Sequence, residues 1–497
     1  MAIRGLLGGA GLPPDPVVLH DLALDQFGQR LARACGDRSP APLLRLPLRD
    51  AAAIRARQDV FRDLDEPAVR AVVGRFTAAM RRTRRGLAVH ARSPTGPAND
   101  RRFLDLALAH LADVRALAAD LAAARPASAA LAGVAEDLAA HVAAGPFGDA
   151  EARAAGLAER LGHFRYDLLI RDDTVTVAPS TEAADHARRV RTLLAPLLPP
   201  EQEAPGEPLD DGLDPLETAV LEQVVQLDPA LFAQLAAFAA TGLVDPELER
   251  LDHELVCCLG YLAVLAPLRA AGLPVCLPEL GGTDLLARDV YDVALAAALV
   301  ERGERPVVND VTLTDAERVL VVSGPNQGGK STLARTFGQL HLLAALGCPV
   351  PGSAVRCVLP DRVLTHFERA ESIGTRDGKL AEELQRLEAL LAATTADSVL
   401  VLNEIFSSTT LADARELSAA VLDRIVQIGA RCLWVSFVDE LAERHPAAVS
   451  MVATVTGDDA IRTYRVVRAP ADGRAYAHTL AQRHGVSAEQ LQARVRR

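Results

Sequence analysis

Apolar residues recur every three or four positions through most of the first half of the chain. One stripe joins Leu104, Leu108, Leu111, Leu117 and Leu121, which would lie along one face of a helix. The same periodicity predicts helices over five stretches: Ala51–Phe61, Pro67–Arg85, Arg102–Ala124, Ala127–Leu161 and Leu216–Ala271. This part of the sequence therefore predicts a mainly α-helical region.

Two shorter stretches interrupt the helical pattern. Tyr166–Ala178 alternates apolar and polar residues, which predicts a β-hairpin around Asp172 and Asp173. Residues 199–215 are rich in proline and acidic residues, so we expect an exposed loop there. Residues 1–45 contain five prolines and are left without an assigned structure.

Beyond about residue 280 the pattern changes to alternating strand-like and helix-like segments. The expected strands are Arg318–Ser323, Val363–Phe367, Ser398–Asn403, Cys432–Phe437 and Val449–Thr456, and the expected helices are Leu333–Leu346, Lys379–Ala393 and Ala412–Ile428. Such alternation implies an α/β sheet. We therefore expect a multidomain protein, with an N-terminal segment (1–45), a helical region (46–280) and an α/β domain (281–497).

A glycine-rich turn lies between the first of these strands and the first helix. It fits the phosphate-binding loop pattern G-x-x-x-x-G-K-[ST], in which backbone N–H groups and a lysine contact phosphates and a hydroxyl ligates Mg²⁺. Only Lys330 and Lys379 are lysines in the whole chain, and Lys330 stands where the pattern needs one. We expect ATP to bind along the whole loop, namely Gly324, Pro325, Asn326, Gln327, Gly328, Gly329, Lys330, Ser331 and Thr332.

A second polar pair follows the apolar strand that ends at residue 403. A phosphate-loop enzyme needs acidic groups at such a strand end, one to hold Mg²⁺ through water and one to orient the attacking water. Glu404 suits the water-orienting role, and Asn403 stands where an aspartate is usual. We therefore predict Glu404 and Lys330 as catalytic residues, and Ser331 and Asn403 as Mg²⁺ ligands, with weaker metal binding because Asn403 is uncharged.

Composition restricts the classes of function. The net charge of −12 gives no support to tight nonspecific DNA binding, although it leaves room for a local basic groove. The seven cysteines have no C-x-x-C spacing, which favours a reduced, intracellular chain. The start is a poor signal peptide, and the apolar run Leu255–Leu268 is too short to span a bilayer. We expect a cytoplasmic protein outside the membrane.

The loop sequence is similar to that of the ATPase domain of the MutS family of DNA mismatch-repair proteins, which has Gly-Pro-Asn-Met-Gly-Gly-Lys-Ser-Thr there. Further similarities follow in order, at Asn309, Gly347–Gly352, Asp361-Arg362, Ile373-Gly374, Glu404-Ile405, Thr409, Asp413 and Asp439–Leu441. The resemblance covers about residues 280–490. It implies an ABC-like ATPase domain after a helical core with lever helices, which works as a homodimer through the ATPase domains and acts on double-stranded DNA.

The sequence also departs from the family pattern. Asn403 replaces the family's acidic Walker B aspartate, and Phe437 replaces a histidine. A Ser-Thr-Phe signature that contacts the partner subunit's nucleotide aligns near Gly378-Lys379-Leu380, after a loop about six residues short. Glu383 keeps the position of a family glutamate, although an exposed helical glutamate is the commoner explanation. We find no N-terminal mismatch-recognition domain in the pattern, so we expect a short MutS-related protein.

These observations leave more than one function open. The first is a DNA-dependent ATPase of DNA repair that binds mismatched or structured DNA and moves its helical arms with ATP. The alternative is a weakly hydrolysing nucleotide switch acting on a protein partner, favoured by Asn403, Phe437 and the acidic charge. A transporter-type or SMC-like ATPase fits the loop less well. The cluster Arg81, Arg82, Arg84 and Arg85 could meet DNA phosphates, but we favour a solvated helix end.

Overall fold

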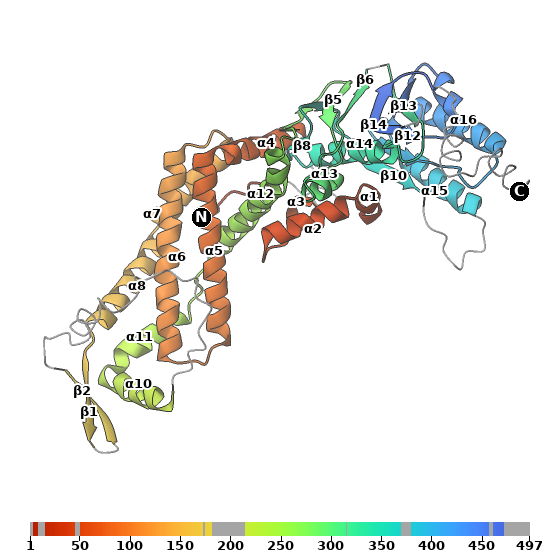
Figure 1. Ribbon diagram of the computed structural model, residues 1–497. Coiled ribbons are helices and arrows are strands. Elements are labelled where there is room, and N and C mark those ends of the chain that lie inside the picture. Colours follow the sequence, from red (N-terminus) through yellow and green to blue (C-terminus); the bar gives the residue numbers. More distant parts are fainter. Residues whose placement is uncertain are drawn as a thin grey trace, which may run out of the picture. The chain divides into compact units, whose positions relative to one another are not determined.

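The computed structural model describes residues 3–7, 15–44, 50–171, 174–180, 214–314, 316–368, 379–456 and 461–471 (Figure 1). The chain divides into two compact units, each built from several stretches of sequence. Unit 1 consists of residues 1–4, 68–126 and 132–252, and unit 2 consists of residues 5–67, 127–131 and 253–497. The domain boundaries expected at residues 46 and 281 stay a prediction.

Unit 1 is built mainly from helices, as the apolar periodicity predicted. They are α5 (Pro67–Arg92), α6 (Pro97–Ala124), α7 (Ala129–Ala143), α8 (Gly145–His163), α10 (Pro215–Leu227), α11 (Pro229–Ala239) and the first part of α12 (Pro246–Ala270). Four of the five leucines in the predicted stripe on α6 are buried: Leu104, Leu111, Leu117 and Leu121. The stretch 127–161 is two helices, because Gly145 and Pro146 begin a new one; proline is tolerated in a first turn but not inside a helix.

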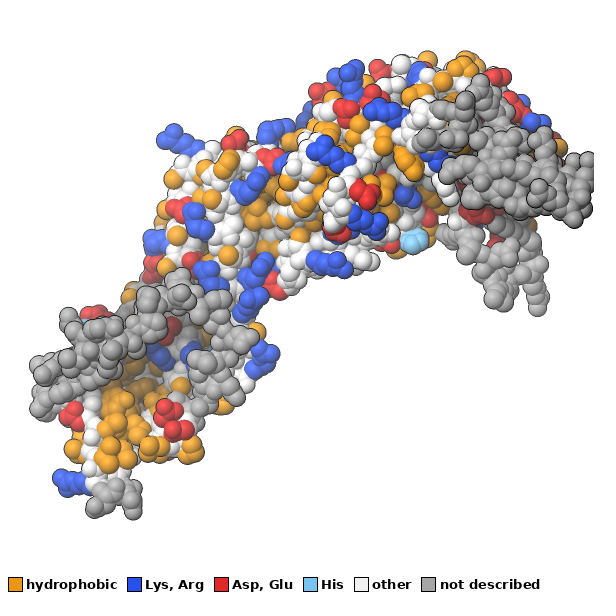
Figure 2. Space-filling model, viewed as in Figure 1, with side chains coloured by type: hydrophobic (Ala, Val, Ile, Leu, Met, Phe, Trp, Pro, Cys, Tyr) orange, Lys and Arg blue, Asp and Glu red, His pale blue; other side chains and the backbone are white. Residues whose placement is uncertain are grey.

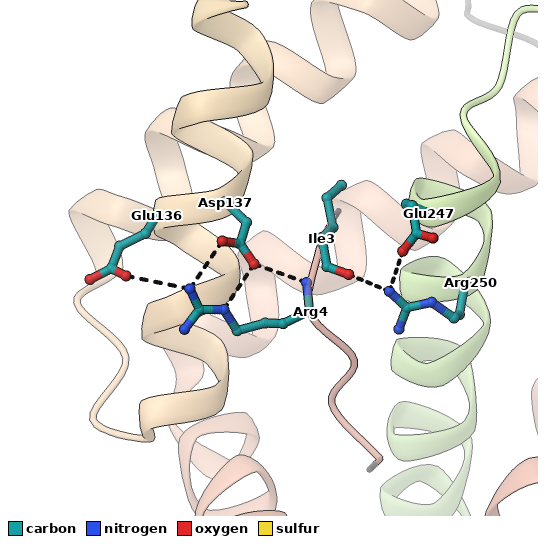
Figure 3. Close-up of polar contacts among 6 residues, drawn as sticks. All are labelled: Ile3, Arg4, Glu136, Asp137, Glu247 and Arg250. Atoms are coloured by element: carbon teal, nitrogen blue, oxygen red, sulfur yellow. Dashed lines mark hydrogen bonds and ion pairs between the residues drawn. The ribbon is translucent and has the colours of Figure 1, made fainter. Parts of the chain in front are cut away.

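The first residues of the chain are held within unit 1 between α7 and α12 (Figure 3). The Arg4 side chain donates two hydrogen bonds to the Asp137 carboxylate, at 2.8 and 3.0 Å, and the Arg4 backbone N–H donates a third at 2.9 Å. The carbonyl of Ile3 accepts a hydrogen bond from Arg250, which also contacts Glu247. A bidentate arginine–carboxylate pair is directional, so these contacts orient residues 3 and 4.

Unit 1 also contains the predicted hairpin, formed by β1 (Tyr166–Arg171) and β2 (Thr174–Pro179) in antiparallel register. Residues 172 and 173, at its turn, lie outside the described residues, as do residues 199–213 of the expected loop. The Gln223 side chain on α10 accepts a hydrogen bond from the Val177 N–H at 3.0 Å and donates one to the Val175 carbonyl at 3.2 Å. This glutamine therefore attaches the outer edge of β2 to α10.

Unit 2 is centred on a six-stranded sheet in the order β10-β11-β12-β7-β13-β14. The first five strands run parallel, and β14 is antiparallel at the edge. Their bounds are β10 (Val363–Phe367), β11 (Val399–Asn403), β12 (Arg431–Val435), β7 (Val319–Ser323), β13 (Ala448–Thr456) and β14 (Ile461–Arg468). Five of these were predicted; β14 was missed because it mixes arginines with apolar residues. All side chains of β7, β11 and β12 are buried, as expected for a parallel sheet covered on both faces.

Helices cover the two faces of this sheet. On one face, α15 (Lys379–Ala393) and α16 (Leu411–Ile428) close a core that includes Trp434 and Leu400. On the other face lies α14 (Lys330–Ala345), whose Gly338 packs closely on the sheet, because a Cβ atom there would lie 3.2 Å from Val401. This α/β core agrees with the fold expected for residues 281–497.

The N-terminal helices of unit 2 pack against the same core, which the sequence did not predict. The Leu22 side chain, between α1 (Pro16–Asp21) and α2 (Leu24–Cys35), would lie 2.5 Å from a Cβ atom on Gly338. The Gln339 side chain also donates a hydrogen bond to the Leu22 carbonyl at 2.8 Å. Arg57, buried on α4 (Ala51–Asp65), donates to the Leu346 carbonyl at the end of α14 at 2.8 Å. The helix that follows the glycine-rich loop is thus held in the middle and at its end.

A smaller sheet completes unit 2, in the order β4-β9-β5-β6, beside the paired strands β3 and β8. The bounds are β3 (Val275–Cys276), β4 (Glu279–Leu280), β5 (Leu285–Val290), β6 (Asn309–Leu313), β8 (Val350–Pro351) and β9 (Ala354–Cys357), with α3 (Ala41–Leu44), α13 (Val293–Val300) and the 3₁₀ helix η1 (Asp439–Glu443). Among the described residues, α12 alone is long and apolar enough to span a membrane, and 61% of its apolar window is buried in the protein. A core helix meets the same criterion. All seven cysteines are free thiols.

Candidate functional site

The glycine-rich loop connects the end of β7 to the start of α14, as the motif predicted. Gly324 and Gly329 have φ values of 117° and 94°, in the region that disfavours every side chain. A Cβ atom on Gly324 would also lie 2.9 Å from the Ala453 carbonyl oxygen of β13, where backbone cannot yield. Both glycines are therefore required, and the N-terminus of α14 opens onto the loop with its positive end.

Lys330 is buried beneath the loop and is held by the loop itself. Its Nζ donates hydrogen bonds to the Gly324 carbonyl at 2.7 Å, the Asn326 side-chain oxygen at 3.2 Å and the Pro325 carbonyl at 3.3 Å. Burial lowers the pKa of the lysine, while the nearby carboxylates of Glu404 and Asp439 oppose that change. The result is a desolvated cation whose three neighbours in the loop are all neutral, and such a cation interacts strongly with an anion.

The remaining loop residues differ in their exposure. Asn326 and Gln327 are exposed at the tip, Pro325 and Gly328 are buried, and Ser331 and Thr332 are half-buried in the first turn of α14. Gln327 has a φ of 60°, which is uncommon for a residue with a side chain. The loop thus presents backbone N–H groups and two hydroxyl side chains at one helix end.

The end of β11 brings the second predicted pair to the same edge of the sheet. β12 stands between β11 and β7, and Lys330 Nζ lies 3.9 Å from a carboxylate oxygen of Glu404. Asn403 is only 9% exposed, and its side-chain oxygen has no hydrogen-bond partner within the described part of the protein. A buried acceptor without a donor is costly, so this oxygen suits a bound water or cation.

The turn after Glu404 is held by Glu383, a residue that we had expected to be exposed. That expectation was wrong: Glu383 on α15 is buried, and it accepts a hydrogen bond from the Phe406 N–H at 2.9 Å. Glu404 and Phe406 both have positive φ values, 52° and 64°. Since such a backbone is strained, the contact with Glu383 stabilises the turn that carries the Glu404 carboxylate.

His366 and Arg386 extend this contact. His366 Nε2 lies 3.7 Å from the Glu383 carboxylate, and Arg386 Nη2 lies 3.3 Å from the same nitrogen. Burial by itself raises the pKa of Glu383, but the nearby His366, the hydrogen bond from the Phe406 N–H and the charge of Arg386 together lower that pKa. The carboxylate therefore stays ionised where it supports the turn.

The end of β12, between the two halves of the site, carries Ser436 and Phe437. Ser436 is buried, and its hydroxyl accepts a hydrogen bond from the Val438 N–H at 3.0 Å. Phe437, where the family pattern has histidine, has an exposed apolar ring. The aligned signature begins at residue 378, outside the described residues, and α15 starts at Lys379.

The edge strand β14 forms a wall beside the loop that sequence reasoning missed. Asn309 donates to the Tyr464 carbonyl at 3.2 Å and accepts from the Val466 N–H at 2.7 Å, and Tyr464 has a strained φ of 58°. Arg462 donates to the Asn326 carbonyl at 2.7 Å. The Tyr464 ring is half exposed, and a Cβ atom on Gly329 would lie 3.5 Å from the Tyr464 carbonyl. The backbone of Tyr464 therefore borders the loop. Asn309, which the resemblance had pointed to, was the sequence signal for this contact.

The arginine cluster on α5 is engaged in contacts within unit 1. Arg82 lies 3.5 Å from Asp113 on α6, and Arg84 pairs with the fully buried Asp252 on α12. The solvated helix end that we favoured is not where the cluster lies, because α5 continues to Arg92, and pairing with Asp113 and Asp252 replaces part of the solvation. This pairing leaves less positive charge available for a DNA backbone than the sequence alone suggested.

Comparison with known proteins finds sequences that are similar to part of this chain. Residues 320–493 match the family model "MutS domain V". A relative described as DNA mismatch repair protein MutS 2, from Halobacterium salinarum, is 33% identical over 38% of this chain and 23% of its own length. Two proteins described as DNA mismatch repair protein MutS are also similar. That from Chlorobium limicola is 31% identical over 33% of this chain and 20% of its own length, and that from Chlorobium phaeobacteroides is 28% identical over 55% and 31%. The match thus spans less than a third of these relatives.

Proposed function

This chain belongs to the MutS family through its domain V, and from that premise we propose that it is a Mg²⁺-dependent ATPase that binds its nucleotide at residues 324–332. The observation that carries the proposal is that a lysine and a carboxylate far apart in the sequence lie close together in the fold. The buried Lys330 Nζ lies 3.9 Å from the Glu404 carboxylate, at the edge where the glycine-rich loop ends β7. A cation for the phosphates and a carboxylate for water are the two groups that phosphoryl transfer needs there.

Each residue of the site has a role in this proposal. Backbone N–H groups of Asn326, Gln327 and Gly329 and the N-terminus of α14 would bind the phosphates, and Lys330 would neutralise their negative charge. Ser331 and Asn403 would hold Mg²⁺, directly or through water, and the unpartnered oxygen of Asn403 supports that fit. Mg²⁺, when bound, would neutralise charge on the transferring phosphate. Glu404, half exposed on its strained turn, would orient the attacking water.

Two further groups would complete the nucleotide site. Tyr464, whose backbone lies beside Gly329 and whose side chain is half exposed, would give an adenine base a surface for stacking. Glu383 would act only through the backbone of Phe406, as a positioning residue for Glu404. Neither role requires contact between Glu383 and the nucleotide.

The wider biological role follows from the relatives and stays part of the proposal. Since the similar proteins are described as DNA mismatch repair proteins, we propose a cytoplasmic role in DNA repair, with binding to mismatched or structured double-stranded DNA. We also propose a homodimer through the ATPase domains, in which ATP moves the helical arms. The acidic net charge of −12 makes any DNA contact a local one.

A second candidate is a nucleotide switch with little turnover that acts on a protein partner. Two observations favour it. Asn403 supplies no negative charge for Mg²⁺, and Phe437 supplies no hydrogen bond between the two halves of the site. Tight ATP binding without hydrolysis would follow from such a site.

A steady-state ATPase assay with and without DNA separates the two candidates. We expect turnover by the native chain to rise with duplex DNA, and Glu404→Ala to bind ATP but hydrolyse it at least about 100-fold more slowly. Arg424→Ala, which removes a positive charge from the exposed face of α16, is the matched control and should keep native rates. ATP binding without turnover on matched, mismatched and branched DNA would instead support the switch.

A further inference from the structure

The outer edge of β1 in unit 1 has no strand partner among the described residues. β1 pairs only with β2, and every residue of β1 is exposed. Its exposed side chains include Leu168 and Leu169, each 48% exposed, and Ile170, which is 71% exposed. Figure 2 shows hydrophobic side chains gathered over the hairpin and the neighbouring α10. Such a patch on a strand edge marks an interaction surface.

The backbone groups that face this open edge can be assigned. The Ser180 N–H donates to the Arg165 carbonyl at 3.4 Å, so Arg165 points its carbonyl toward β2. Gln223 bonds the outward-facing groups of Val175 and Val177, which stand opposite Ile170 and Leu168. Because backbone groups alternate along a strand, the N–H and C=O groups of Leu168 and Ile170 point away from β2. No partner for them lies among the described residues, so they can pair with another strand.

Within the described part of the chain, the edge of β1 lacks the usual protection against pairing. Natural edge strands carry a central charge, a proline or a bulge, or are covered. In β1 the central residues are Leu168, Leu169 and Ile170, and its register with β2 is regular. Charges stand on either side of them, at Asp167 and Arg171. The edge of β1 can therefore pair with another strand. The charges of Asp167 and Arg171 favour a strand that places opposite charges beside them.

The order of residues in β1 is complementary to itself. When two copies of Asp167-Leu168-Leu169-Ile170-Arg171 run antiparallel with Leu169 opposite Leu169, each Asp167 faces the other copy's Arg171. Each Leu168 then faces an Ile170. These are the residues whose backbone groups point outward, so they form hydrogen-bonded pairs, and Leu169 falls at a non-hydrogen-bonded pair, where side chains are closest.

We propose that β1 pairs antiparallel with β1 of a second copy of this chain, about a two-fold axis at Leu169. The two hairpins then form one four-stranded sheet, with both Asp167–Arg171 pairs closed. A single strand edge is far smaller than a typical stable interface, so the contact is weak in isolation and needs covalent capture to be measured.

Cysteine scanning of the full chain tests the register. Leu169→Cys should cross-link to itself under mild oxidation with oxidised glutathione, which takes up the two electrons and two protons of the thiols. Leu168→Cys and Ile170→Cys should each cross-link at least about tenfold less alone, but efficiently when mixed, because they face each other across the pair. The native chain and Asp149→Cys, on an exposed surface of α8, measure background reaction.

Charge reversal tests the identity of the partner. In the Leu169→Cys background, Asp167→Arg and Arg171→Asp should each lower cross-linking about tenfold, because like charges then face each other. Mixing the two variants should restore it, since both facing pairs become opposite in charge. Native melting temperatures verify that the exposed substitutions leave the fold intact.

Three results would overturn the proposal. Cross-linking of Leu169→Cys at the Asp149→Cys background would show that the edge is covered by this chain or by another protein. Equal cross-linking at 168, 169 and 170 would exclude the register. Charge variants that lose cross-linking without recovery on mixing would exclude a second β1 as the partner.

Discussion

Two strands of similar apolar content, β11 in unit 2 and β1 in unit 1, meet opposite surroundings. β11 reads Val-Leu-Val-Leu-Asn, and all its side chains are buried between helices. β1 reads Tyr-Asp-Leu-Leu-Ile-Arg, and all its side chains are exposed. In β11 the polar residues come only at the strand end, where Asn403 and Glu404 meet the glycine-rich loop. In β1 charges bracket the apolar residues. The difference teaches that the positions of the polar residues along a strand, more than its apolar content, distinguish a buried strand from an exposed edge strand.

Matched leucine truncations would test this contrast most strongly. Leu400→Ala removes a fully buried side chain from β11 and should lower the free energy of unfolding by about 2–5 kcal/mol. Leu169→Ala removes an exposed side chain from β1 and should change the free energy of unfolding by less than about 0.5 kcal/mol. Urea denaturation of both variants provides the comparison. Equal losses would mean that β1 is covered in solution within a single chain.

A second prediction, with a smaller expected effect, concerns the contact between the nucleotide base and Tyr464 on β14. Tyr464→Ala should weaken ATP binding about 5–150-fold, because base stacking on an aromatic ring contributes about 1–3 kcal/mol. Binding of inorganic triphosphate, which has no base, should stay within about twofold of native. Tyr166→Ala on β1 removes an exposed tyrosine elsewhere and is the control. Parallel losses for both ligands would argue against stacking.

Restoring a charge at the end of β11 should strengthen the metal site. Asn403→Asp adds the carboxylate that the family pattern has there, beside the buried and unpartnered oxygen. We expect Mg²⁺ to support ATP turnover at about tenfold lower concentration, since a carboxylate binds this hard cation better than an amide does. A Mg²⁺ titration of the ATPase rate measures the shift. An unchanged midpoint would remove Asn403 from the metal site.

The pH dependence of stability should show the smallest effect, through Glu383. Its pKa is lowered in the folded chain, so its contribution is present above its ordinary pKa of 4.5 and is lost as pH falls through the lower folded value. Glu383→Gln should therefore be less stable than native near neutral pH, and the two should converge in acid. Thermal melts across this pH range provide the measurement; a constant difference would contradict the assigned shift.

Local patterns predicted the parts of this molecule that depend on neighbouring residues. The strand, turn and helix around residues 319–345, the strand ending at Asn403 and the hairpin at 166–179 all follow from short-range periodicity and glycine positions. What the sequence missed depends on contacts between distant segments. Neither the packing of Leu22 on Gly338 nor the hydrogen bond from the Phe406 N–H to Glu383 leaves a periodic trace. β14 was missed because an edge strand carries arginines on its exposed positions.

The central claim is that an anion binds over the buried Lys330, and the affinity for ATP in the presence of Mg²⁺ tests it most directly. Equilibrium titration of a fluorescent ATP analogue should give binding at least about 100-fold weaker for Lys330→Ala than for the native chain, since charge-assisted hydrogen bonds to several phosphate oxygens are lost. Arg424→Ala should bind as the native chain does. Native affinity in a folded Lys330→Ala protein would contradict the account.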